Sequence, residues 1–156
     1  SRTPIAPLSL VLTAEAAAQF DELVLDGRVK TMVRQTADAW PNVFRQGRIV
    51  PAVDYLRAQR VRTLLMREME ESLAGVDLFV APTYGGRSLL LTNLTGHPSV
   101  VVPNGFRLSD GTPTSVTFTG RLFGESDLLA VADLYQRATD FHVRRPKLPD
   151  ALPANG

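Results

Sequence analysis

The strongest periodic pattern of hydrophobic positions along the chain lies at residues 52–74. Its apolar side chains recur at helical spacing, and they are Val53, Leu56, Val61, Leu64, Leu65, Met69 and Leu73. Arg and Glu side chains lie mostly between them, and Gly75 comes directly after. The pattern predicts an amphipathic helix that packs on a core and ends at Gly75.

Shorter helical patterns precede this helix. Residues 1–12 contain two prolines and are expected to form an extended lead-in. Thr13 is a candidate N-cap for a helix over residues 14–26, because its hydroxyl can accept a bond from a backbone N–H of the first turn. Residues 42–47 predict a short turn of helix just after a proline.

After Gly75 the pattern changes to short apolar runs that are typical of strands. Residues 76–82 and 99–103 are nearly continuous apolar runs that end in proline, which predicts strands buried on both faces. Residues 114–120 alternate between polar and apolar side chains and predict a third strand. Asn104-Gly105 and Asp110-Gly111 are turn signals.

A last helix is predicted to begin near Ser126. Leu128, Ala132, Tyr135 and Ala138 share one of its faces, and His142 and Arg144 are expected near its C-terminal end. Residues 146–156 are rich in proline and predict an extended tail.

The order of these elements predicts an α/β fold in which a mixed sheet of few strands is covered by helices. With 156 residues, the chain fits a single domain over residues 1–156. Three apolar strands make a small sheet that needs cover on both sides. An isolated chain is therefore expected to expose an apolar edge or face and to form a homodimer or aggregate.

Composition narrows the possible chemistry. The net charge of +1 gives no general field for nucleic acid or anionic lipid, so neither is expected as a partner. Cysteine is absent, which excludes thiol catalysis, disulfides and Cys-based zinc sites. No apolar run reaches the length of a membrane span and no signal peptide is visible, so a cytoplasmic protein without membrane contact is expected.

The residues alone show no recognisable catalytic centre. His97 and His142 are not set in a metal-ligand spacing, and structural or surface roles are expected for both. The only lysines, Lys30 and Lys147, are expected to be solvated, which does not suit a catalytic base. Gly85-Gly86-Arg87-Ser88 is interpreted as a turn between strands, because no helix is expected after it. No metal and no cofactor are expected.

One segment resembles a known family. Residues 92–106 are similar to a C-terminal hallmark of the amidase-signature enzymes, in which an Asn-x-x-Gly-x-Pro turn leads into an apolar strand. The matching residues are Asn93, Gly96 and Pro98. Three flanking blocks resemble the same family in the same order, and they lie at residues 53–60, 76–83 and 120–125. The resemblance covers about residues 13–148.

The resemblance implies hydrolysis of a carboxamide C–N bond by a Ser–Ser–Lys triad, with backbone amides as the oxyanion hole. The family carries this triad N-terminal to the matched region, in a Gly/Ser-rich stretch and an upstream Lys, and this sequence has no such stretch. The chain is thus expected to be the C-terminal portion of an amidase, catalytically silent by itself, with no catalytic residue of its own. Its expected partners are the N-terminal part of the same enzyme and a small carboxamide substrate.

The family motif also suggests where this portion would meet a substrate. A substrate-pocket wall is expected at five residues near the motif, namely Thr92, Asn93, Thr95, Gly96 and His97. An equally weighted alternative is that this loop only turns the chain inside the fold. The alternative function is a non-catalytic binding protein similar to the amidase-like subunit of tRNA-dependent amidotransferases.

Overall fold

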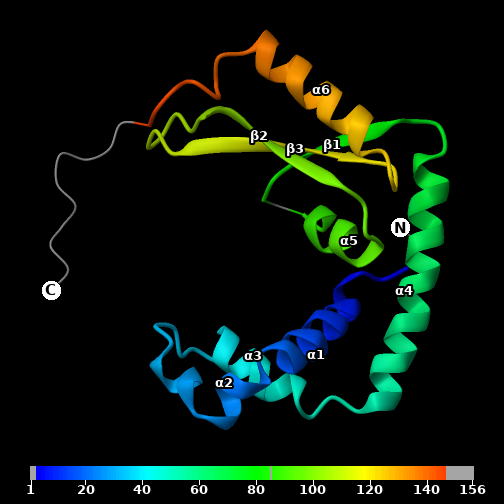
Figure 1. Cartoon of the computed structure of the whole chain (residues 1–156), viewed down its shortest axis with the longest axis vertical. Helices are drawn as coiled ribbons and strands as arrows, with labels where there is room; N and C mark the ends of the chain where they lie inside the picture. The colour runs from blue at the N-terminus through cyan, green and yellow to red at the C-terminus, as the bar shows by residue number, and fades with distance from the viewer. Residues whose placement is uncertain (1–2, 85, 147–156) are drawn as a thin grey trace, which may run out of the picture. The chain divides into compact units, whose positions relative to one another are not determined.

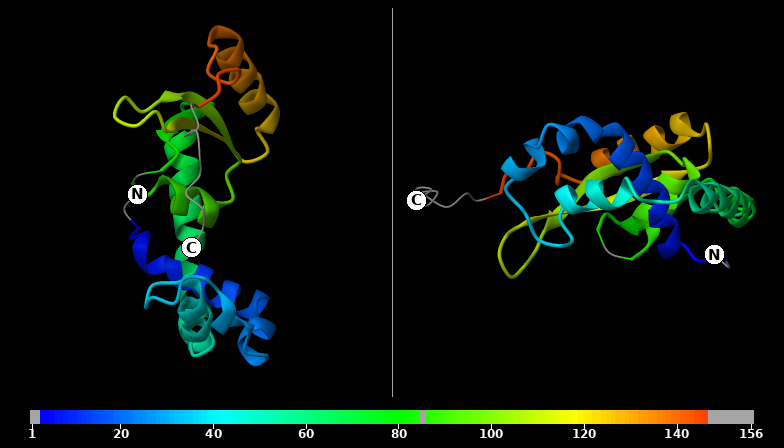
Figure 2. Two further views of the ribbon diagram at one scale, coloured as in Figure 1. Left: turned by 90° about the vertical axis from the view of Figure 1, so that its left-hand side faces the viewer. Right: turned by 90° about the horizontal axis from the view of Figure 1, so that it is seen from below.

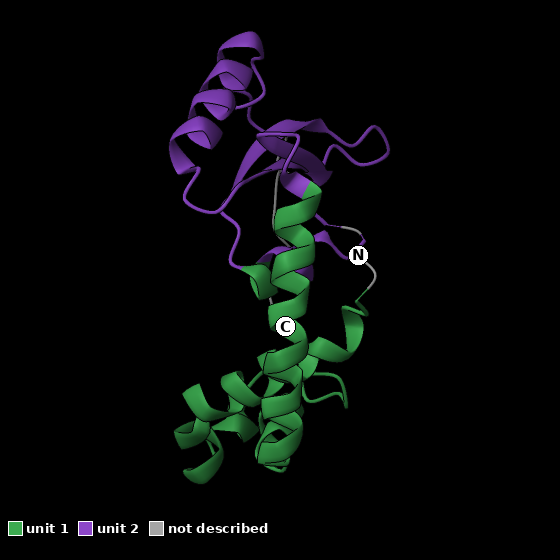
Figure 3. Ribbon diagram, turned by 90° about the vertical axis from the view of Figure 1, so that its right-hand side faces the viewer, with its two compact units in different colours: residues 1–72, 93–95 green, residues 73–92, 96–156 purple. Residues whose placement is uncertain are grey.

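The computed structural model describes residues 3–84 and 86–146, and its elements are shown in Figure 1. They are, in chain order, η1 (Ala6–Leu8), α1 (Ser9–Gln19), α2 (Asp21–Leu25), η2 (Arg28–Thr31), α3 (Trp40–Gly47), α4 (Ala52–Leu73), β1 (Leu78–Pro82), α5 (Ser88–Thr95), β2 (Ser99–Phe106), β3 (Pro113–Gly120) and α6 (Glu125–Ala138). The chain divides into two compact units, one of residues 1–72 and 93–95 and the other of residues 73–92 and 96–156 (Figure 3).

The first unit is helical, and its core lies where α1, η2 and α3 meet. Ala16, Val29 and Phe44 are buried together there, and Leu23, Val24 and Met32 pack around them. Small side chains allow α1 and α3 to approach closely. A Cβ on Gly47 would lie 2.4 Å from both the Ala17 Cβ and the Thr13 carbonyl oxygen, so this contact requires glycine.

The N-terminal expectations were partly wrong. Residues 6–12 are helical rather than extended, because the fixed φ of Pro7 is compatible with the first turn of a helix. Thr13 is therefore inside α1 and is not its N-cap. The single helix expected over residues 14–26 is two helices, because the backbone of Phe20 leaves helical geometry at φ −108° and ψ 23°.

Helix α4 confirms the helix predicted at residues 52–74. Leu65, Met69 and Leu73 of the predicted stripe are buried, as is Ala58. By contrast, Val53, Leu56 and Leu64 are exposed. The predicted apolar stripe was therefore too wide. The face of α4 that is buried contains residues 58, 65, 69 and 73, and the neighbouring apolar positions are exposed.

The second unit is built on a three-stranded sheet with the order β1-β3-β2. Both pairings are antiparallel, so the sheet expected to be mixed is antiparallel among the described strands. Helix α6 lies along one face of it (Figures 1 and 2). Val102, Phe118, Leu128 and Ala132 form the core between helix and sheet, and an α/β fold is thus confirmed.

The strands are not buried on both faces as predicted. Val101 pairs with Thr117 and is exposed because it lies on the face opposite to the one that α6 covers. Val80 pairs with Phe118 and lies on the covered face, but it is exposed on the edge strand β1.

Asn104-Gly105 is a bulge within β2 rather than a turn, since the register shifts between Pro103 and Phe106. Gly105 adopts a φ of +97° there.

The C-terminal prediction holds for α6 but not for the residues after it. The helix begins at Glu125 and ends at Ala138, so His142 and Arg144 lie beyond its last turn. Arg144 instead pairs with Asp140 at 2.7 Å and lies over the ring of Phe141. Of the predicted tail at residues 146–156, all but Pro146 lies outside the described residues.

Candidate functional site

Of the five residues expected to form a pocket wall, Thr92, Asn93 and Thr95 lie in the last turn of α5, and Gly96 and His97 follow it. The sequence pattern did not predict this helix. The segment Gly86-Arg87-Ser88 does not join two strands directly, because α5 begins at Ser88. The available signal was the helical spacing of Leu91, Leu94 and Thr95. This signal was missed because the helix is only eight residues long and is flanked by Gly and Pro residues, which are typical of turns.

Gly96 ends this helix. Its φ of +79° places it in the left-handed region, and its N–H donates to the carbonyl of Thr92 at 2.9 Å. The N–H of His97 donates to the same carbonyl at 3.3 Å. These bonds satisfy a carbonyl that the helix end would otherwise leave unpaired, which is the usual reason for glycine at this position. The predicted Asn-x-x-Gly-x-Pro turn is thus a helix cap leading into β2.

The structure separates the five residues by exposure. Thr92, Thr95 and His97 are buried, and Thr95 is completely inaccessible. Asn93 and Gly96 are exposed. Buried polar side chains therefore alternate along this segment with the exposed residues Asn93 and Gly96.

Arg62 of α4 supports the same helix end and was not recognised from the sequence. Its Nε donates to the carbonyl oxygen of Leu94 at 2.5 Å, and its Nη1 donates to the side-chain oxygen of Gln59 at 3.3 Å. A cationic donor on one of the last carbonyls of a helix satisfies that carbonyl and complements the helix dipole. Arg62 thus positions the end of α5 without itself being part of the expected wall.

Replacing Arg62 by alanine is expected to lower the free energy of unfolding by about 2 kcal/mol, because a charge-assisted, half-buried hydrogen bond is lost. Urea unfolding followed by the fluorescence of Trp40, the only tryptophan, measures this. Arg60→Ala is the matched control, since Arg60 is exposed on the same helix. Equal unfolding midpoints for the two variants would show that the bond to Leu94 contributes nothing.

The lysine and histidine side chains of the described residues differ in exposure. Lys30 is exposed, as predicted, and Lys147 lies outside the described residues. His142 is exposed, whereas His97 is buried. Among residues 3–84 and 86–146, no group of three or more His, Cys, Asp or Glu side chains is placed to hold a metal ion.

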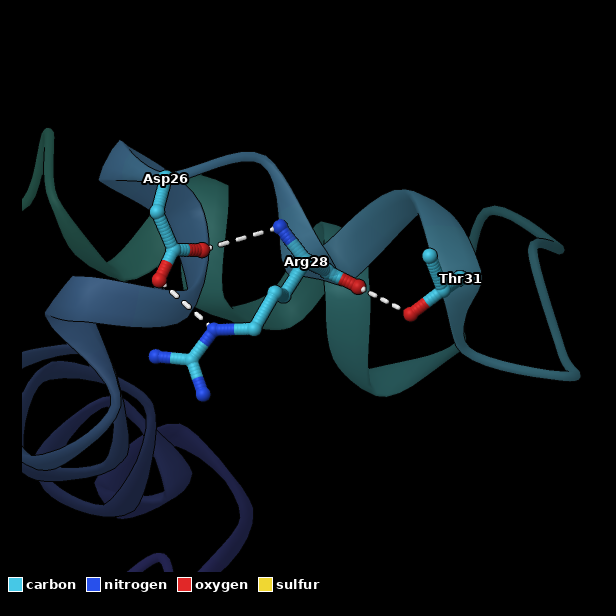
Figure 4. A network of polar contacts seen from close by, with 3 residues as sticks. All are labelled: Asp26, Arg28 and Thr31. Carbon is cyan, nitrogen blue, oxygen red and sulfur yellow. Dashed lines mark hydrogen bonds and ion pairs between the residues drawn. The ribbon is translucent and has the colours of Figure 1, made fainter.

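One carboxylate with a lowered pKa, that of Asp26, lies in a turn. Asp26 accepts the backbone N–H of Arg28 at 3.0 Å and its Nε at 2.6 Å, and Thr31 donates to the Arg28 carbonyl at 2.8 Å (Figure 4). The backbone bond from Arg28 is the largest cause that holds the pKa of Asp26 below its usual value of 3.8, and burial partly opposes it. This network fixes the chain between α2 and η2.

Two grooves of the helical unit flank α1 and do not include the expected wall residues. One of about 250 Å³ is lined by residues that include Asp21 and Arg48, and one of about 330 Å³ by residues that include Glu15 and Tyr55. Tyr55 donates to the Glu15 carboxylate at 2.9 Å and accepts a bond from Gln59 at 2.8 Å. The polar side chains named for the second groove therefore pair with one another or with Gln59.

Solved structures place the fold among the amidase-signature enzymes. A bacterial aryl acylamidase of that family matches with a TM-score of 0.66 at 20% identity, over 94% of this chain and 37% of that chain. The allophanate hydrolase of Kluyveromyces lactis matches with a TM-score of 0.65 at 19% identity, over 98% of this chain and 30% of that chain. No protein-family model matches the sequence. No helix in the described part of the chain is long and apolar enough to span a membrane.

The sequence itself is similar to one of the subunits of glutamyl-tRNA(Gln) amidotransferases. The Chloroflexus aggregans protein is 41% identical over 116 residues, which is 62% of this chain and 23% of the relative. The Methanosarcina acetivorans protein is 33% identical over 111 residues, or 59% of this chain and 23% of the relative. The family resemblance of the sequence is thereby confirmed: the chain is related to amidase-signature proteins and has their fold. It spans about a quarter of the length of these relatives, and the alternative of a non-catalytic binding protein is not favoured.

Proposed function

We propose that the chain is the C-terminal region of an amidase that hydrolyses the C–N bond of a small carboxamide, and that it is catalytically silent alone. The observation that carries this proposal is a sequence match to the family without the family's catalytic stretch. The sequence is 41% identical to a relative of which it spans 23%, yet it holds none of the Gly/Ser-rich stretch in which the family keeps its serines. The triad and the oxyanion hole would then come from a part of the protein N-terminal to these residues.

In this proposal the end of α5 forms one wall of the substrate cleft. The cap at Gly96 fixes the direction in which the chain leaves the helix, and Arg62 holds the carbonyl of Leu94. Asn93 is exposed and offers both a donor and an acceptor, which are the groups that a carboxamide needs as partners. Loops and helix ends on a rigid scaffold commonly carry such contacts.

The apolar surface left by the chain supports the same proposal. Val80 and Val101 of the sheet and Leu56 and Leu64 of α4 are each more than half exposed. Where exposed apolar side chains gather into larger patches, such patches commonly mark contacts with another protein or another part of the same protein. A chain that lacks its N-terminal partner would bring these surfaces against a second copy, so a homodimer of the isolated chain belongs to the proposal, as does a cytoplasmic location.

The reading frame upstream of these codons tests the proposal. It should encode a Gly/Ser-rich stretch, with a Lys before it. A reading frame without that stretch would contradict an amidase. So would amide hydrolysis by the 156-residue chain that is abolished by substitution of one of its own serines.

A further inference from the structure

The bulge of β2 contains an asparagine followed by a glycine, Asn104-Gly105. In such a pair the backbone nitrogen of the second residue can reach the side-chain carbonyl carbon of the first, because glycine has no Cβ to obstruct the approach. The pairing of β2 with β3 skips both residues, which lie together opposite the single residue Thr114. A bulge of this kind interrupts the ladder of backbone hydrogen bonds. The dipeptide is therefore held less tightly by the sheet than the rest of the strand.

The fold itself requires the glycine of this pair. Gly105 adopts a φ of +97°, a backbone conformation that is costly for a residue with a side chain. A Cβ at this position would also lie 3.4 Å from the Cε1 atom of the Phe141 ring, which is a tight contact. A side chain that would shield the backbone nitrogen is thus disfavoured both by the backbone and by packing.

Tyr135 of α6 binds the side chain of the asparagine. Its hydroxyl donates a hydrogen bond to Oδ1 of Asn104. The Tyr135 ring meets Phe118 edge-on at a centroid distance of 5.5 Å, and Phe118 belongs to the core between sheet and helix, so the hydroxyl is held in place. A fixed donor at this oxygen stabilises the negative charge that develops there when a nucleophile attacks the carbonyl carbon Cγ.

We propose that Asn104 is a site of spontaneous deamidation that Tyr135 promotes. The Gly105 nitrogen loses its proton and forms a bond to Cγ of Asn104, and the bond from Cγ to Nδ2 then breaks. Nδ2 takes up a proton and leaves as ammonia, which gives a succinimide ring. Water adds to one of the two ring carbonyls and opens the ring to aspartate or isoaspartate. The exposed position of Asn104 gives water access to it, and the net reaction consumes one water and releases one ammonia.

The product changes the strand at the bulge. Isoaspartate adds one methylene group to the backbone of β2, and either product places a carboxylate beside the Tyr135 hydroxyl. The backbone carbonyl of Asn104 accepts a hydrogen bond from Oγ1 of Thr114 at 3.2 Å, so the added methylene group displaces a contact that joins the bulge to β3. Deamidation therefore loosens the pairing of β2 with β3 as the protein ages.

Peptide mass spectrometry of the full-length product of the reading frame, stored at neutral pH and sampled over time, tests this inference. Asn42 and Asn93 are the internal controls, since each is followed by a residue with a side chain and lies in a helix. Conversion at Asn104 is expected to be at least about tenfold faster than at either control. Conversion at Asn104 that is no faster than at these two residues would overturn the inference.

Tyr135→Phe is the matched variant, because it keeps the ring against Phe118 and removes only the hydroxyl. A second Asn–Gly pair, Asn155-Gly156, lies outside the described residues and is the reference within each sample. The ratio of conversion at Asn104 to that at Asn155 is expected to fall about tenfold in the variant, because one hydrogen bond to the developing charge is lost. A ratio that stays the same or rises would overturn the inference. Since the readout is a mass and not amide hydrolysis, either failure leaves the proposed function unaffected.

Discussion

Replacing Gly47 by alanine is expected to destabilise the helical unit by about 3 kcal/mol or to prevent its folding. The added Cβ would lie 2.4 Å from the Thr13 carbonyl oxygen and 2.4 Å from the Ala17 Cβ. Because one of these atoms belongs to the backbone of α1, no side-chain rotation relieves the overlap, and the two helices must move apart. Forced overpacking of a fitted contact typically costs about 1–3 kcal/mol, and more where backbone must shift.

Urea unfolding followed by Trp40 fluorescence measures this effect, because Trp40 lies in α3 with its ring centroid 5.6 Å from that of Phe44. Gly75→Ala is the matched control, since a Cβ at Gly75 has no neighbour within 4 Å. A Gly47→Ala protein as stable as the control would show that α1 and α3 do not pack as described.

Phe118→Ala is expected to cost about 3–5 kcal/mol in the second unit, the range for truncating a buried aromatic side chain. Phe118 is 6% exposed and lies in the core with Val102, Leu128 and Ala132. Its ring also meets the edge of Tyr135 at a centroid distance of 5.5 Å. The substitution leaves a cavity between the sheet and α6 and removes this aromatic pair.

Hydrogen exchange of the β2 and β3 amides measures the loss, because these strands pair across the position of Phe118. Phe123→Ala removes the same side chain from an exposed position and is the matched control. It is expected to leave the exchange of these amides unchanged. If both variants lost protection from hydrogen exchange to a similar extent, α6 would not pack on this face of the sheet.

The long periodic elements could be predicted from the sequence. Helix α4 and strands β1, β2 and β3 follow from helical spacing, apolar runs and alternation, and their order indicated the fold class. Predictions from single Pro and Gly residues were wrong at two positions. Pro7 lies within a helical segment, and Gly105 serves a bulge rather than a turn. Helix α5 was missed because eight residues between turn signals carry too little periodicity.

The candidate site shows the same division. The motif residues Asn93, Gly96 and Pro98 marked the segment, and Gly96 could be recognised as a residue that permits a tight turn. Arg62 could not be found in this way, because its contact joins positions 32 residues apart.

Ammonia release from phenylacetamide by the full-length product of the reading frame, beside the 156-residue chain alone, tests the central claim most directly. We expect turnover by the full-length protein that is lost when the upstream nucleophilic serine is replaced by alanine, and none by the chain alone. Turnover by the chain alone that depends on one of its own serines, or none by the full-length protein with any carboxamide tried, would contradict the claim.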